Sequence, residues 1–151
     1  MAAKIVPAPD YEDRVRTSFA RQKAMATIGA ELTLVTPGII EIEMPYSAAL
    51  TQQHGFLHAG VISTALDSAC GYAAFSLMPA DAAVLTIEFK INLTAPADGQ
   101  RAVAVGEVIR SGRTITVCRI DAYVDKGGRR THCATGLSTL MTVTGRAGVK
   151  D

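Results

Sequence analysis

One acidic side chain lies within a long apolar segment, where a carboxylate could act in catalysis. Between residues 58 and 78, Asp67 is the single acidic or basic residue. A carboxylate among apolar side chains is costly unless a partner stabilises it, and such a group can serve as a general base or a nucleophile. The alternative is structural: the carboxylate would accept a hydrogen bond from Ser63, Thr64 or Ser68. We favour the functional interpretation, because aspartate is a poor helix former and no Lys or Arg lies within a turn.

A second feature lies where the same apolar segment begins. The sequence HGFLHAG, residues 54–60, leads directly into it. The first backbone N–H groups of a helix have no intrahelical acceptor, and with the positive end of the helix dipole they can stabilise an oxyanion. Ala59 and Gly60 add almost no side chain to obstruct a ligand carbonyl. We therefore expect a carbonyl-polarising amide at the start of this helix.

The spacing of these two features limits how they can act together. Asp67 follows Ala59 by eight residues, which is ~12 Å along a helix axis. One small carbonyl group cannot contact both positions on a single helix. A shared site therefore requires two antiparallel copies of the helix, packed side by side in a homodimer, and the many small residues of the segment would permit that approach.

The surrounding pattern predicts an α+β fold. An amphipathic helix is expected at about residues 10–26, and residues 58–78 are apolar around nearly the whole circumference, which predicts a buried central helix. We expect an antiparallel sheet of five to six strands wrapped around that helix, with the last four strands in meander order. The alternating segments that predict strands are residues 31–36, 40–44, 85–94, 101–110, 114–124 and 131–143.

Composition bounds the remaining possibilities. A chain of 151 residues is predicted to be one domain, residues 1–151, with its core at about 29–143. A net charge of +1 and the absence of Trp argue against a nucleic-acid partner. No segment reaches the ~20 apolar residues of a membrane span, and the N-terminus does not resemble a secretory signal. The three cysteines and three histidines have no disulfide or zinc spacing, so we expect a cytoplasmic protein with no metal and no cofactor.

Residues 52–60, QQHGFLHAG, with Asp67 nine residues after His58, resemble the signature of the hotdog-fold acyl-CoA thioesterases. The similarity points to the phenylacetate-degradation type, the 4-hydroxybenzoyl-CoA thioesterase-like branch, and covers roughly residues 31–143. It implies a hotdog fold, in which an antiparallel sheet wraps a long helix. It also implies homodimers with a continuous sheet, often doubled to homotetramers, and active sites at the dimer interface.

The resemblance implies a role for each matching residue. Asp67 matches the catalytic carboxylate, acting as general base or nucleophile, and the Ala59 amide matches the N–H that polarises the thioester. His58 matches the motif histidine, and Thr86 falls where the family often has a Ser or Thr that positions water. Two positions depart from the usual pattern: Ala59 replaces a glycine, which keeps the amide if φ is negative, and Gln52 replaces an asparagine but keeps both amide functions.

Basic residues are concentrated in the last third of the chain. From Arg101 onward they exceed acidic residues by five. Coenzyme A carries several phosphate charges, and Arg110 and Arg113 flank one predicted turn where they could bind them. Gly60, beside Ala59, is a further candidate for substrate contact. The alternative for these arginines is a solvated strand edge that they protect from pairing.

Three functions are compatible with these residues. The first is a thioesterase that cleaves acyl-CoA, with an aryl or medium-chain acyl group, to the free acid and CoA. The second is a non-catalytic module that binds acyl-CoA or an acyl carrier, and Asp67 argues against it, because a pure binder has no reason to bury an unpaired carboxylate. The third is a hotdog dehydratase or hydratase, for which the sequence lacks a His-plus-acid pair on different elements.

Overall fold

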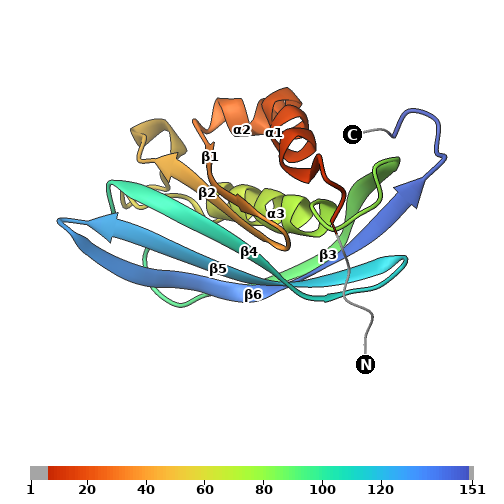
Figure 1. The fold of residues 1–151 in the computed structure, drawn as a ribbon. Helices are drawn as coiled ribbons and strands as arrows, with labels where there is room; N and C mark the ends of the chain where they lie inside the picture. The colour runs from red at the N-terminus through yellow and green to blue at the C-terminus, as the bar shows by residue number, and fades with distance from the viewer. Residues whose placement is uncertain (1–6, 150–151) are drawn as a thin grey trace.

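The computed structural model describes residues 7–149, in which a curved six-stranded antiparallel sheet wraps around one long helix (Figure 1). That helix is α3 (Ala59–Phe75), and its start agrees with the prediction to within one residue. The predicted α+β fold with a sheet around a central helix is confirmed. The other elements are α1 (Tyr11–Arg21), α2 (Lys23–Thr27), β1 (Glu31–Thr36), β2 (Ile39–Pro45), η1 (Ala48–Leu50), β3 (Ala82–Leu93), β4 (Arg101–Ser111), β5 (Ile115–Lys126) and β6 (Arg129–Thr144).

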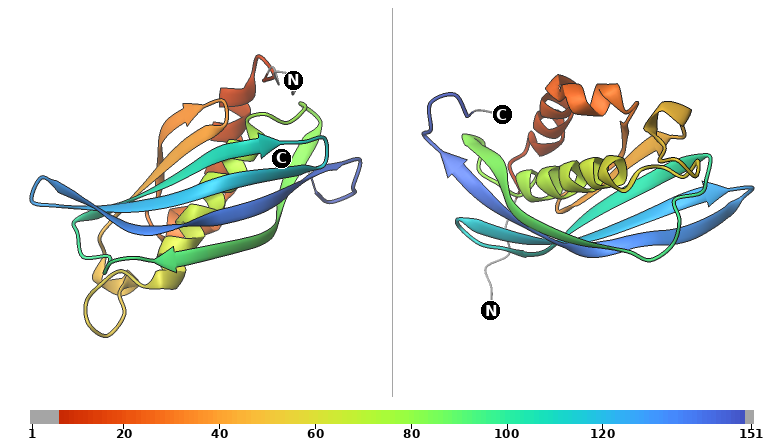
Figure 2. Two further views of the ribbon diagram at one scale, coloured as in Figure 1. Left: turned by 90° about the horizontal axis from the view of Figure 1, so that it is seen from below. Right: turned by 180° about the vertical axis from the view of Figure 1, so that it is seen from behind.

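The strand order is β1-β2-β4-β5-β6-β3, so β3 lies at an edge of the sheet beside β6 (Figure 2, left). The predicted meander of the last four strands is therefore wrong for β3, although β4, β5 and β6 do follow one another. The reason lies in the connection after β3, which is too long for a tight hairpin. It passes the start of α3, where the Leu57 amide donates to the Ala97 carbonyl at 3.1 Å.

The single N-terminal helix predicted for residues 10–26 is two helices, α1 and α2. The chain is extended at Gln22, with φ −81° and ψ 94°, which interrupts the helical hydrogen bonding. The Gln22 side-chain oxygen accepts a hydrogen bond from Ser68 Oγ at 2.8 Å, so the break coincides with a contact to α3. None of the helices within residues 7–149 is long and apolar enough to cross a membrane.

One face of α3 is buried against the sheet, and another is not. The buried side packs so closely that a Cβ on Gly106 of β4 would lie 2.5 Å from the Ala69 backbone, which explains the glycine at that position. The prediction of a helix buried all round is wrong along one side, because small and polar residues there remain wholly or partly exposed. This open stripe of α3 consists of Gly60, Ser63, Thr64, Asp67 and Gly71.

Candidate active site

The start of α3 has one backbone donor to spare. His58 caps the helix: its Nδ1 accepts from the Gly60 amide at 2.9 Å, and its carbonyl accepts from the Val61 and Ile62 amides. The Ala59 amide has no acceptor within residues 7–149. Ala59 is helical with negative φ, since no described non-glycine residue has positive φ. The alanine that replaces the usual glycine therefore leaves its N–H available to a ligand.

A cavity of about 450 Å³ opens beside this amide, and Ala59 is among its lining residues. Gln52 lines the same cavity, with its side-chain oxygen held by the backbone N–H of His54 and its NH₂ group without a partner in residues 7–149. The two predicted positions are thus brought together, and both present donors. The rest of the lining is mostly apolar and comes from three separate segments, at Phe56–Leu57, Ile62 and Leu93–Ala97, with Cys133 of β6.

Asp67 forms a hydrogen bond with the residue predicted to work beside it. Thr86 Oγ1 donates to Asp67 Oδ1 at 2.8 Å, and the second carboxylate oxygen has no hydrogen-bond partner within residues 7–149. Asp67 is half-buried rather than buried as expected. Hydroxyl groups nearby on α3 do not bond it: they donate elsewhere, Ser63 to the Ala59 carbonyl, Thr64 to the Gly60 carbonyl and Ser68 to Gln22.

A β-bulge in β3 aims Thr86 at α3. The alternation in the sequence predicts that Thr86 and Glu88 share a face, but the register with β6 shifts between them, at Ile87. Thr86 pairs with Leu140, which is fully buried on the face of the sheet towards α3, whereas Glu88 pairs with Thr139 on the opposite face. The extra residue therefore turns Thr86 towards Asp67. A regular alternation of apolar residues carries no signal of this bulge.

Other predicted site residues are not brought together within one chain. Asp67 and Ala59 lie on an uninterrupted helix, so they are separated by ~12 Å along its axis, and Asp67 does not line the cavity. Arg110 and Arg113 are at the β4–β5 turn, which lies at the other end of the sheet, near the C-terminal end of α3 (Figure 1). The His, Cys, Asp and Glu side chains of residues 7–149 form no group of three that could hold a metal.

Several lining residues of the cavity were not anticipated. Phe56 lies within the motif of residues 52–60 but had no predicted role, and Leu93, Pro96 and Cys133 had no functional signal in the sequence. Their convergence depends on how the β3–β4 connection crosses the start of α3. The three cysteines are buried free thiols. A hydrogen bond to Cys118 and burial raise the pKa of the Cys70 thiol far above its ordinary value, so Cys70 is an inert core residue.

A long helix wrapped by a six-stranded antiparallel sheet in this strand order defines a hotdog-fold protein. Residues 54–131 match the family described as the thioesterase superfamily, which is just over half of the chain, and the protein belongs to that family.

Similar proteins agree with this assignment. A candidate esterase of Saccharolobus solfataricus is 35% identical over 58% of this chain, and the match spans 61% of that relative's length. The crystal structure of a thioesterase family protein from Silicibacter pomeroyi is 56% identical, with a TM-score of 0.88 over 89% of this chain and 99% of its own. The E. coli PaaI protein from the phenylacetic acid degradation operon shares the fold, with a TM-score of 0.79 at 16% identity over 96% of this chain and 99% of its own.

Proposed function

We propose that this thioesterase-superfamily protein hydrolyses acyl-CoA thioesters, with an aryl or medium-chain acyl group, to the free acid and CoA. The observation that carries the proposal is the Ala59 amide at the start of α3, which has no acceptor among the described residues and lies beside a largely apolar cavity of about 450 Å³. A thioester carbonyl accepts one strong hydrogen bond there, and the apolar lining suits an acyl chain or an aromatic ring. We also propose a cytoplasmic location, which the three free thiols support.

The reacting carboxylate, Asp67, comes from a second copy of the chain. The Ala59 amide polarises the thioester carbonyl, and Asp67 of the second copy either activates water or attacks the carbonyl carbon directly. In the first route, Asp67 takes a proton from water, the water oxygen bonds to the carbonyl carbon, and the carbon–sulfur bond breaks; the CoA sulfur then takes the proton from Asp67. In the second route, an Asp67 oxygen bonds to the carbonyl carbon as the carbon–sulfur bond breaks. Water then hydrolyses the resulting acyl–Asp67 anhydride, which gives the free acid, restores the carboxylate and supplies the proton for the CoA thiolate. Thr86 donates to one carboxylate oxygen, which leaves the other to take part in the reaction.

The edge of the sheet supports a homodimer. Strand β3 has 12 residues, is paired on one side only, and exposes large apolar side chains: Ile87 is 55% exposed, Phe89 47% and Leu93 57%. A long apolar edge is a liability for a monomer. Antiparallel pairing of β3 with its copy would cover this edge and bring the open stripe of α3, with Asp67, close to that of the other chain.

The outer face of the sheet, turned away from α3, supports further assembly into homotetramers. Leu137 is 52% exposed and Ile115 41% exposed on adjacent strands of this face. A further copy of the chain packed on this face would cover both side chains.

The test is a panel of acyl-CoA thioesters followed by release of free thiol. We expect turnover of aryl and medium-chain substrates, and a dimer or larger assembly by light scattering. An acyl-CoA that binds without release of thiol would favour the non-catalytic binding module instead. A monomer that hydrolyses thioesters would contradict the shared site.

A further inference from the structure

A second cavity, of about 330 Å³, adjoins the first and differs from it in charge. Both are lined by Phe56, Ala95 and Pro96, so the segment that follows β3 separates two neighbouring compartments. The first holds the free amide and is mostly apolar. The second is lined in addition by Lys126 and Arg129, from the hairpin between β5 and β6.

The β5–β6 hairpin places these two cations directly opposite each other. Its two turn residues, Gly127 and Gly128, have φ of 56° and 79°, a conformation that glycine adopts without strain and that suits a two-residue hairpin. Lys126 and Arg129 form the cross-strand pair next to the turn. Like charges in this arrangement repel each other, so an anion bound between them would be favoured.

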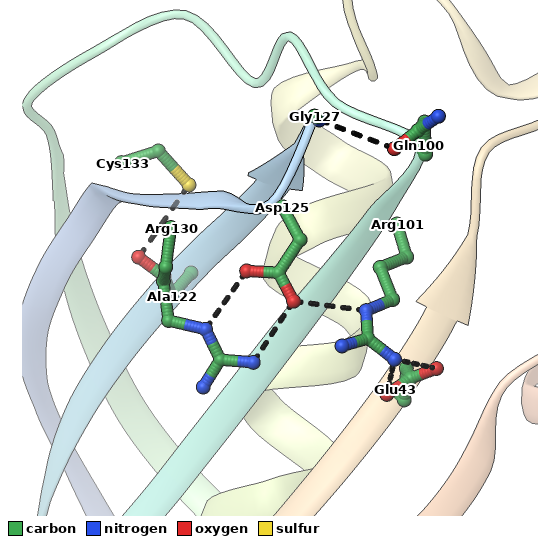
Figure 3. A network of polar contacts seen from close by, with 8 residues as sticks. All are labelled: Glu43, Gln100, Arg101, Ala122, Asp125, Gly127, Arg130 and Cys133. Carbon is green, nitrogen blue, oxygen red and sulfur yellow. Dashed lines mark hydrogen bonds and ion pairs between the residues drawn. The ribbon is translucent and has the colours of Figure 1, made fainter.

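Two nearby arginines on the outer face of the sheet, one on β6 and one on β4, are already neutralised. Arg130 and Arg101 both bond Asp125, and Arg101 also bonds Glu43 (Figure 3). The hydrogen bonds from Arg130 and Arg101 lower the pKa of the Asp125 carboxyl to about 2, so it stays ionised. These side chains are committed to an ion-pair ladder that crosses β2, β4, β5 and β6.

The two cations on the inner face of the hairpin are compensated only in part. Asp98 is the one acidic residue among those lining the second cavity, and it is paired with Lys126 Nζ at 2.6 Å. Arg129 is exposed and forms no ion pair within residues 7–149. The described lining of the cavity therefore carries an excess positive charge. The Arg129 guanidinium lies at its rim and forms no hydrogen bond within residues 7–149.

We infer that Arg129, with Lys126, binds the phosphate-bearing nucleotide end of a CoA thioester whose acyl end occupies the neighbouring apolar cavity. This inference rests on the proposed function. Acyl-CoA has the matching sequence of parts: an apolar acyl group, a thioester carbonyl, a flexible pantetheine arm and a nucleotide with phosphate groups. The two compartments present the complementary surfaces in the same order, and Arg129 suits a phosphate because its planar fork can donate two parallel hydrogen bonds.

The assignment competes with Arg110 and Arg113, which the sequence pointed to. Those residues lie at the opposite end of the sheet of the same chain (Figure 1). The two possibilities are separated by comparing variants at each place, and the exposed side chains involved can be truncated without disturbing the core.

The experiment measures KM and kcat of Arg129→Ala with an acyl-CoA and with the N-acetylcysteamine thioester of the same acid, which lacks the phosphates. We expect KM for acyl-CoA to rise about tenfold, the effect of losing one charge-assisted hydrogen bond. The kcat for acyl-CoA and both constants for the N-acetylcysteamine thioester should stay unchanged. Arg129→Lys should recover part of the loss. Arg130→Ala removes the neighbouring arginine, which bonds Asp125, and is the matched control with no expected change in KM. Arg110→Ala and Arg113→Ala test the competing assignment.

Three outcomes would overturn the inference: an equal rise in KM for both thioesters, an unchanged KM in Arg129→Ala, or a rise confined to Arg110→Ala or Arg113→Ala. Failure of the proposed function looks different, because the unaltered protein would then release no thiol from either substrate. In that case calorimetry with CoA still decides the matter: weaker binding of CoA to Arg129→Ala than to the unaltered protein supports the phosphate site, and equal binding refutes it.

Discussion

The start and the middle of α3 differ in what each contributes to a reaction. At the start, the Ala59 amide has no acceptor within residues 7–149 and faces a cavity that Gln52 also lines, but none of the described lining residues is acidic. At the middle, Asp67 lies on the open stripe of α3 and accepts a hydrogen bond from Thr86 of the edge strand β3. Neither residue lines that cavity. One region can polarise a carbonyl and the other can supply a base or a nucleophile. Since a straight helix holds them apart, the two regions complement each other only between chains.

The largest loss of activity is expected when the carboxylate in the middle of α3 is removed. Asp67→Asn keeps the size of the side chain and an oxygen that can accept from Thr86 Oγ1, but it removes the charge. We expect kcat to fall by ~10²–10⁴, the usual effect of losing a general base. Thermal unfolding of the variant serves as the control for folding. Turnover equal to that of the unaltered protein would remove Asp67 from the mechanism.

Removing the backbone N–H at the start of α3 tests whether this region polarises the carbonyl. Ala59→Pro removes only the N–H in question, because proline is well tolerated at the first position of a helix, and His58, at φ −65° and ψ 137°, has the conformation preferred before proline. We expect kcat to fall by ~10²–10³, as when an oxyanion-hole donor is lost. Ala59→Gly retains the amide and should keep most of the activity. If the proline variant stays active while its helix content is unchanged, another donor polarises the carbonyl.

A smaller effect is expected from the hydrogen bond that orients the carboxylate. Thr86→Ala removes the donor to Asp67 Oδ1, and the loss of one hydrogen bond to a charged group predicts a fall in kcat of about tenfold. Thr86→Ser keeps the hydroxyl and should restore activity. A Thr86→Ala loss as large as that of Asp67→Asn would mean that Thr86 itself contacts the reacting atoms.

The two regions also differ in how well the sequence predicts them. The helix start is local: residues 54–60 fix His58 as its cap, and Ala59 follows as the residue with the spare amide. The pairing of Thr86 with Asp67 depends on two non-local features, the place of β3 beside β6 and the bulge at Ile87. The family resemblance suggested Thr86 as a site residue. The regular alternation of residues 85–94, however, predicts that Thr86 lies on the same face of the sheet as Glu88, which is turned away from α3.

Tertiary arrangement likewise decides which cations are available. In the sequence, Arg101, Arg119 and Arg130 are equivalent to Arg129, yet the first three are engaged in ion pairs across the outer face of the sheet. Which arginine is left without a partner depends on cross-strand register, since strands alternate their side chains between faces. A count of charged residues locates the basic last third of the chain but cannot single out one arginine within it.

Subunit mixing tests the shared site most directly. Asp67→Asn and Ala59→Pro chains, each nearly inactive alone, are unfolded or dissociated together in equal amounts and reassembled. Half of the dimers are then hybrids, and each hybrid has one site with both the Ala59 amide and the Asp67 carboxylate intact, so activity should recover to about a quarter of that of the unaltered protein. If both groups act within one chain, no hybrid contains an intact site and the mixture stays as inactive as its components.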